Sequence, residues 1–132
     1  MCSSDLMLYI DASAFVAAVS AEPGTRAMRA MLDAGHPTVA SALLEIEAAR
    51  ALAGTSRDVR ARADALLESV DLVAIDRAVI AKAAHLAPGV RLRSPDAIHL
   101  ATALSMPEPV AMLTLDQRLL AASLVVGLRP AI

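Results

Sequence analysis

The feature that most constrains the fold is the alternation of short apolar runs with longer segments of helical character. The apolar runs lie at residues 7–10, 38–40, 72–75 and 110–114. Runs this short are typical of strands buried on both faces of a parallel sheet. Because strands alternate with helices, the sequence predicts an α/β fold with helices on both faces of the sheet. We expect a central, mostly parallel sheet of four or five strands, the fifth being an edge strand at residues 127–128.

The segments between the runs carry the signals that begin helices. Serine and aspartate favour the N-cap, because their side-chain oxygens accept hydrogen bonds from the first helical turn. We expect such caps at Ser13, Ser41, Asp76 and Ser94, and Pro95 suits the first helical position after Ser94. The expected helices span residues 14–19, 25–34, 42–53, 57–68, 77–86, 95–104 and 117–122.

Length and composition indicate one domain with an aliphatic core. The chain has 132 residues, of which 57% are hydrophobic and only 2% are aromatic. This length fits a single domain, which we expect at residues 7–132. Residues 1–6 are largely polar, so we expect a disordered extension there and a natural start at Met7. So much aliphatic surface on a small domain predicts a partner, either a second copy or another protein.

Charge and cysteine content limit the partners and the cellular compartment that we expect for the protein. The formal net charge of −2 gives no overall basic signature for nucleic acid, so any contact with phosphates must use a local patch. Cys2 is the only cysteine, which excludes an intramolecular disulfide and fits a reducing compartment. The sequence has no apolar run of the roughly 18 residues that a membrane span requires, and it lacks a signal-peptide pattern. We expect a cytoplasmic protein.

Four acidic residues stand at positions that the predicted fold brings together. Asp11 directly follows the first strand, and Asp116 lies just past the fourth. Asp96 lies in the first turn of its helix, where unpaired N–H groups favour an anion. Glu47 lies on the helix side that also bears Leu44, and a carboxylate on an apolar face needs a partner. Ligands of parallel α/β sheets bind beyond the carboxyl ends of the strands, so we expect the four acids to meet at that edge.

Each acid alone has a simpler interpretation. An aspartate at the end of a strand is often a turn former or a helix cap. Glu47 could instead be a partly exposed helix residue that pairs with Arg50 on the next turn. The four together favour a metal site, because neighbouring carboxylates repel one another and raise each other's pKa values until a cation neutralises them.

The predicted ligands are oxygen atoms, which suit Mg²⁺ or Mn²⁺ and not zinc. His36, His85 and His99 lack the paired spacing of a zinc site, and we interpret His99 as a packing or hydrogen-bonding residue. A divalent ion held by acids serves phosphate chemistry, since it neutralises phosphoryl oxygens and lowers the pKa of a bound water. The sequence contains no G-x-S-x-G elbow, Walker loop or G-x-G-x-x-G motif for another chemistry.

Four segments in a fixed order form the most specific pattern in the chain. They are residues 9–14 (YIDASA), 41–52 (SALLEIEAARAL), 92–103 (LRSPDAIHLATA) and 113–119 (LTLDQRL). Together they resemble the acidic segments of PIN-domain ribonucleases, in particular the VapC-type toxins. The third segment is the most specific match, although Pro95 stands where the family more often has an apolar residue. The resemblance covers the chain from its first predicted strand to the C-terminus.

This resemblance implies a fold, an activity and partners. The fold is a sandwich of a parallel sheet between helices. The activity is endonucleolytic cleavage of RNA by water activated at Mg²⁺ or Mn²⁺. The partners are a small cognate antitoxin protein, which would make this chain the toxin of a type II toxin–antitoxin pair, and a second copy in a homodimer.

The resemblance also assigns roles to the four acids. Asp11, Glu47, Asp96 and Asp116 take the catalytic and metal-binding positions. Asp11 and Asp96 are expected to contact the metal directly, while Glu47 and Asp116 bind a second metal or orient water. Glu45 is the competing acid of its helix, but residues two apart lie on different helix faces.

Other residues are expected to support the site. Ser13 and Thr114 could hydrogen-bond the carboxylates, although helix capping and strand propensity explain them equally well. Arg91 and Arg93 lie just before Asp96 and are expected to contact the phosphates of an RNA substrate. The alternative for both arginines is a solvated surface position.

Three other functions compete with the nuclease. A catalytically inactive PIN-like protein-binding module is the alternative function, and the intact set of four acids argues against it. A receiver-like domain needs an acidic pair near the first strand and a late lysine, whereas Lys82 is the only lysine and follows the third strand. A haloacid-type phosphatase needs Asp-x-Asp, but Asp11 is followed by Ala12 and Ser13.

Overall fold

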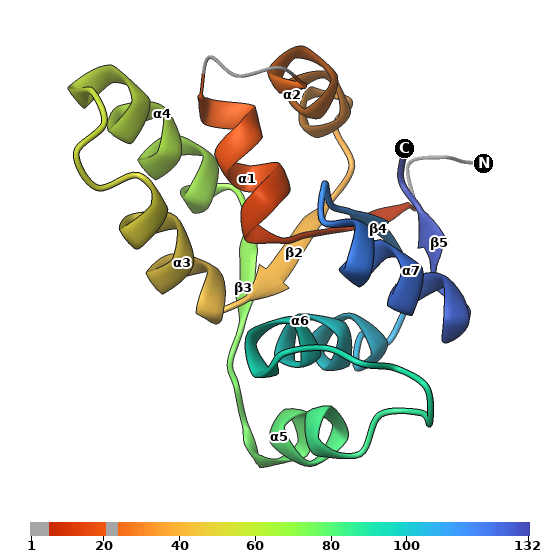
Figure 1. Ribbon diagram of the computed structural model, residues 1–132. Helices are drawn as coiled ribbons and strands as arrows, with labels where there is room; N and C mark the ends of the chain where they lie inside the picture. Colours follow the sequence, from red (N-terminus) through yellow and green to blue (C-terminus); the bar gives the residue numbers. More distant parts are fainter. Residues whose placement is uncertain (1–5, 21–23) are drawn as a thin grey trace.

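The computed structural model describes residues 6–20 and 24–132, so the extension expected at residues 1–6 lies outside the described residues except for Leu6. The described chain is a sandwich in which one sheet lies between two groups of helices (Figure 1). The strands are β1 (Met7–Ile10), β2 (Thr38–Ser41), β3 (Asp71–Val73), β4 (Val110–Leu113) and β5 (Arg129–Pro130). They pair in the order β3-β2-β1-β4-β5, and every pair is parallel. The predicted α/β fold is confirmed.

Seven helices accompany the sheet in the described residues. They are α1 (Ala12–Val19), α2 (Thr25–Asp33), α3 (Leu43–Ala51), α4 (Arg57–Glu68), α5 (Arg77–Ala84), α6 (Ser94–Leu104) and α7 (Gln117–Val125). All seven were expected; half of their bounds agree with the expected ones, and the other half differ by one to three residues. Among these helices, none has the length and apolar character that crossing a membrane requires.

Two pairs of neighbouring strands, β1 with β4 and β2 with β3, end at residues that pair with each other. β4 stops at Leu113, one residue before the predicted end, because its pairing partner Ile10 is the last residue of β1. β3 stops at Val73 because its partner Ser41 ends β2. A strand can extend only while a neighbouring backbone offers hydrogen bonds, so the ends of these strands are set in pairs.

The expected edge strand at residues 127–128 was placed too early. Gly127 has a φ of +90°, and its N–H and that of Leu128 donate to carbonyls of the last turn of α7. Both residues therefore close the helix, in the left-handed conformation that glycine favours at this position. The edge strand β5 begins only afterwards, at Arg129.

Three of the four expected helix caps were misplaced by one or two residues. Asp76 caps α5 as predicted, but Asp11 and not Ser13 caps α1, and its side chain accepts from the Ala14 N–H. The N-cap of α3 is Ala42 and that of α6 is Arg93. Aspartate and serine are equally good caps, so local preference could not decide between Asp11 and Ser13. Ser41 still accepts from the Leu43 N–H at 3.1 Å, one residue before the observed cap of α3.

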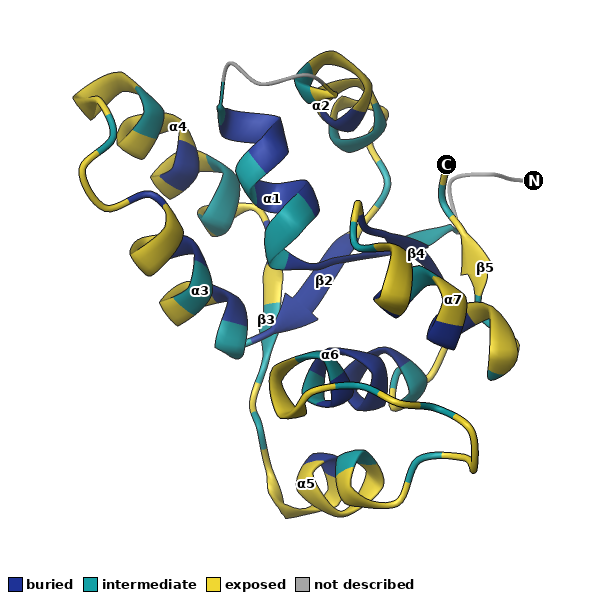
Figure 2. Cartoon of the chain, in the orientation of Figure 1, coloured by how far each residue is buried: buried dark blue, intermediate teal, exposed yellow. Residues whose placement is uncertain are grey.

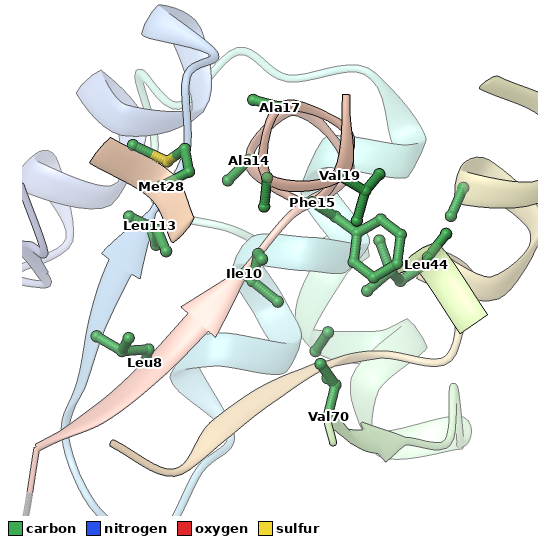
Figure 3. Close-up of a cluster of buried hydrophobic side chains, with 14 of the residues drawn as sticks. Leu8, Ile10, Ala14, Phe15, Ala17, Val19, Met28, Leu44, Val70 and Leu113 are labelled. Atoms are coloured by element: carbon green, nitrogen blue, oxygen red, sulfur yellow. The ribbon is translucent and has the colours of Figure 1, made fainter. Parts of the chain in front are cut away.

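Side chains alternate between the two faces of β1 and build two separate cores. Leu8 and Ile10 pack with Phe15 and with the apolar faces of α1 to α4 (Figure 3). Tyr9 points to the opposite face and packs with Leu100 of α6 and with apolar residues of α7. The strands β1, β2 and β4 are buried, whereas β3 and β5 are more exposed at the edges (Figure 2).

The strand order reverses at β1, and this reversal positions the site. From β1 the chain proceeds through β2 and β3 to one side of the sheet, and then returns to form β4 and β5 on the other side. The loops that leave β1 and β4 therefore depart to opposite faces from adjacent strand ends. In open parallel sheets such a switch point forms the crevice in which ligands bind.

The first core depends on Phe15, the only phenylalanine of the chain, which is 0% exposed. We expect Phe15→Ala to lower the free energy of unfolding by about 3–5 kcal/mol, because the substitution leaves a cavity. Urea denaturation measures this loss. Ile46→Ala, at a site that is 60% exposed on α3, is the control and should change stability by no more than about 0.5 kcal/mol. Equal effects of the two substitutions would contradict the assigned core.

Candidate functional site

Asp11 stands at the carboxyl end of β1 and is only 4% exposed. One carboxylate oxygen, Oδ1, accepts from the Ser13 hydroxyl at 2.8 Å and from the Ala14 N–H at 3.1 Å. The other, Oδ2, accepts from the Thr114 hydroxyl at 2.7 Å. Three donors therefore fix the carboxylate in one orientation.

Burial nevertheless raises the pKa of Asp11 above its ordinary value. Loss of hydration penalises the charged form, and this is the largest effect on the group. The hydrogen bonds from Thr114, Ala14 and Ser13 act in the opposite direction, without cancelling it. The carboxylate is thus held in place by neutral hydrogen-bond donors, which do not supply the positive charge that would offset its burial.

The hydroxyls of Ser13 and Thr114 tie the loop after β4 to the start of α1. The Leu115 N–H donates to Ser13 Oγ at 2.9 Å, and the Asp116 N–H donates to Thr114 Oγ1 at 3.0 Å. The two hydroxyl oxygens lie 3.2 Å apart. Each hydroxyl thus donates to the Asp11 carboxylate while accepting from the backbone of the loop that carries Asp116.

Asp96 and Asp116 lie beside Asp11 at this edge. Asp116 is half-buried and caps α7, with Oδ1 accepting from the N–H groups of Arg118 and Leu119. Asp96 lies in the first turn of α6. Burial raises the pKa of Asp96, and the negative charge of Asp116 raises it further, as does that of Asp11 to a smaller extent. The charges of Asp116 and Asp11 therefore both reach Asp96.

Glu47 projects from α3, and its side chain is 26% exposed. Its Oε1 lies 2.6 Å from Nε2 of His99 on α6. This contact differs from the pairing with Arg50 that the sequence left open. Glu45, the competing acid, is exposed and lines a hollow between α3 and α4 with Leu52, away from His99.

His99 connects Glu47 to the core beneath the sheet edge. Its Nδ1 lies 2.7 Å from the hydroxyl of Tyr9, and the two rings meet edge to face with centroids 5.8 Å apart. The Tyr9 hydroxyl also accepts from the Ser41 N–H at 3.0 Å. Burial raises the pKa of Tyr9 far above its ordinary value, so its hydroxyl stays protonated. His99 is a hydrogen-bonding residue, as expected.

The amino-acid sequence did not identify Tyr9 as a residue that supports the site. Its signal was its place as the only tyrosine of the chain, inside an otherwise apolar strand. A buried tyrosine hydroxyl requires a polar partner on the same face. The sequence does not show which face that is, nor that His99 lies across from it.

The edge is acidic but is not a closed metal cage. In residues 6–20 and 24–132 there is no group of three or more His, Cys, Asp or Glu side chains arranged to hold a metal ion. Asp116 and Asp11 act on Asp96 through their charges, while Glu47 reaches the same edge through His99. Mg²⁺ commonly binds to one or two carboxylates and keeps several waters, so oxygen donors in this open arrangement fit that ion.

The arginines fall into two groups. Arg62 donates through two nitrogens to the Val19 carbonyl, and Arg60 donates to the Thr55 carbonyl, so both brace the backbone. Arg93 is exposed at the N-cap of α6, and its charge lowers the pKa of Asp96. Arg91 is exposed and lines a hollow with residues of α7. Of these four arginines, Arg93 acts on an acid of the edge.

Comparisons with known proteins agree with this architecture. Residues 8–123 match the family described as PIN domain. Ribonuclease VapC46 of Mycobacterium tuberculosis (strain ATCC 25618 / H37Rv) is 37% identical over 122 residues, covering 92% of this chain and 93% of that protein. Ribonuclease VapC47 of Mycobacterium tuberculosis (strain CDC 1551 / Oshkosh) is 35% identical over 127 residues, covering 92% and 93%.

Two solved structures share the fold at low sequence identity. A toxin–antitoxin complex from Klebsiella pneumoniae contains a chain that matches with a TM-score of 0.67 and 22% identity, covering 83% of this chain and 86% of that one. PAE2754 from Pyrobaculum aerophilum matches with a TM-score of 0.59 and 21% identity, covering 90% and 80%. Both support the order of strands and helices described above.

The raised pKa of Asp11 links stability to pH. A carboxyl whose pKa is higher in the folded than in the unfolded chain stabilises the fold below its ordinary pKa of 3.8, and this stabilisation is lost as pH rises through the folded value. We therefore expect Asp11→Asn to raise the free energy of unfolding at neutral pH but to give no such gain below pH 3.8. Urea denaturation in EDTA at both pH values measures the difference.

The matched control is Asp76→Asn. Asp76 also caps a helix, with its side chain accepting from the Val79 N–H at 2.9 Å, but it is exposed. The same substitution there should not produce the pH-dependent gain. If Asp11→Asn destabilises the protein at neutral pH, the charge at Asp11 stabilises the fold, contrary to the expected penalty for its burial.

Proposed function

Because this chain belongs to the PIN-domain family and within it to the VapC-type proteins, we propose that it is a divalent-metal-dependent endoribonuclease. The relatives named above as ribonucleases cover nearly the whole chain. The activity we propose is hydrolysis of RNA by water activated at Mg²⁺ or Mn²⁺, held at the acidic edge of the sheet. The protein would act as the toxin of a type II toxin–antitoxin pair.

The single observation that carries this proposal is the Asp11 carboxylate, which is only 4% exposed at the carboxyl end of β1 and is held by three hydrogen-bond donors. Near it, the pKa of Asp96 is raised by burial and then by the charges of Asp116 and Asp11. Like charges that converge at the switch point of a parallel sheet are costly to the fold unless a cation or a cationic ligand neutralises them. We infer that these acids are retained for that ligand.

Each acid has a distinct part in the proposed site. Asp11, fixed by three donors, and Asp96 would contact the metal directly, while Glu47 and Asp116 would bind a second ion or orient water. The ion, when bound, would neutralise the phosphoryl oxygens and lower the pKa of a water molecule. The hydroxyls of Ser13 and Thr114 leave Asp11 little freedom to turn away from it.

Partners form the second part of the proposal. One solved structure of the same fold is a toxin–antitoxin complex, which supports a small cognate antitoxin for this chain. On α7, Leu124 is 50% exposed and Val125 is 68% exposed, which supports a protein partner or a homodimer. We also propose that residues 7–132 are one domain and that the protein works in the cytoplasm.

The nuclease proposal is tested by metal dependence in wild type and Asp11→Asn. We expect RNA cleavage that requires Mg²⁺ or Mn²⁺ and stops in EDTA. Asp11→Asn should lower the rate by about 100-fold or more, because even outer contacts of metal sites are commonly worth 10- to 100-fold. Cleavage of a labelled RNA at fixed Mg²⁺ concentration measures this.

Asp76→Asn is again the matched control and should cleave RNA at the wild-type rate. Cleavage that persists in EDTA, or that Asp11→Asn leaves unchanged, would contradict the proposal. A folded wild type that cleaves no RNA but binds a protein partner would favour the alternative function, an inactive PIN-like binding module.

Arg91 and Arg93 are the proposed contacts to the substrate phosphates. We expect Arg93→Ala to raise KM for RNA and to reduce the salt dependence of binding by about one counterion, since it removes one phosphate contact. Filter binding over a series of salt concentrations measures this slope. Arg57→Ala, at the exposed start of α4, is the control. An equal change of slope in both variants would show that Arg93 has no special role.

A further inference from the structure

A chain of buried polar contacts runs from the backbone of β2 to the carboxylate of Glu47. It begins at the Ser41 N–H, passes through the hydroxyl of Tyr9 and the ring of His99, and ends at Glu47 Oε1. Its three contacts measure 3.0, 2.7 and 2.6 Å. We propose that His99, held by Tyr9, is the positioning residue that fixes the Glu47 carboxylate at the acidic edge.

One set of hydrogen-bond directions satisfies every group in the chain. The Ser41 N–H can only donate, so the Tyr9 oxygen accepts from it. In this set the Tyr9 hydroxyl donates to Nδ1 of His99, which accepts. This leaves the hydrogen of the imidazole on Nε2, where it donates to a carboxylate that only accepts. All four groups are satisfied by one tautomer of His99.

Glu47 needs such a partner more than Asp11 and Asp116 do. Asp11 and Asp116 have short side chains that accept backbone N–H groups at helix N-termini, so their own turns hold them. Glu47 lies in the interior of α3, on a longer side chain with more rotamers and no N-cap to hold it. The contact from α6 replaces this missing constraint.

His99 is itself rigid enough to serve this purpose. It is 1% exposed, and Tyr9 beneath it is 0% exposed. The ring is therefore fixed by Tyr9 on one side and presents Nε2 to the half-buried Glu47 on the other. Because Tyr9 lies in β1 and Asp11 directly follows it, the same strand that places Asp11 also places Glu47 through His99.

This inference rests on the proposed function, and two substitutions of His99 test it. In place of histidine, glutamine can put an N–H near the position of Nε2, whereas asparagine reaches only the position of Nδ1. We expect His99→Asn to lower kcat by about 10- to 100-fold and to raise the Mg²⁺ concentration for half-maximal activity, with KM for RNA unchanged. His99→Gln should recover most of this loss.

Metal binding gives a readout that does not depend on catalysis. Titration calorimetry with Mn²⁺ should show weaker binding to His99→Asn than to wild type or His99→Gln. In a Glu47→Gln background, His99→Asn should cause no further loss, since the group that it positions is already gone. Ser123→Ala, which removes a buried hydrogen bond within α7, is the control for a general effect on stability.

The outcomes separate this inference from the nuclease proposal. If the wild type cleaves RNA with Mg²⁺ and both His99 variants lose activity equally, in proportion to their loss of stability, His99 is only structural and the inference is overturned. If the wild type cleaves no RNA and binds no Mn²⁺, the proposed function fails and the inference fails with it. A hydrogen on Nδ1 instead of Nε2, seen in the ¹⁵N spectrum of the wild type, overturns the inference whatever the activity.

Discussion

The parallel pairing of β1 with β4 is the constraint on which the rest of the structure depends. It aligns Ile10 with Leu113, so the two chains leave the sheet side by side. Asp11 and Thr114 follow these paired residues, and the 2.7 Å hydrogen bond between their side chains is a direct result. Without this register the loop that carries Asp116 would have no fixed relation to Asp11.

The same arrangement carries an unfavourable electrostatic free energy. A nearly buried carboxylate at Asp11 is opposed by the loss of hydration and is only partly compensated by three donors. Asp96 and Asp116 add like charges at the same edge. Natural proteins tolerate such costs chiefly at functional sites, and here the cost is concentrated at the switch point of the sheet.

The helix α6 joins the acidic edge to the second core. Asp96 in its first turn faces the edge, and His99 three residues later lies against Tyr9. Leu100 of the same helix packs in the second core. Packing of α6 on the sheet therefore places two site residues at once, so the apolar interior and the polar site share one supporting element.

The sequence by itself determined the α/β class, the alternation of strands and helices and the acids at strand ends, because these depend on local periodicity and on residues next to each other in the chain. Tertiary structure alone decided that Asp11 caps α1, that strands end in pairs, and that Glu47 contacts His99 and not Arg50. The paired strand ends and the Glu47–His99 contact join residues far apart in the chain, and the Asp11 carboxylate that caps α1 is also held by Thr114, 103 residues on. Their partners are chosen by helix packing and strand register, which no local pattern encodes.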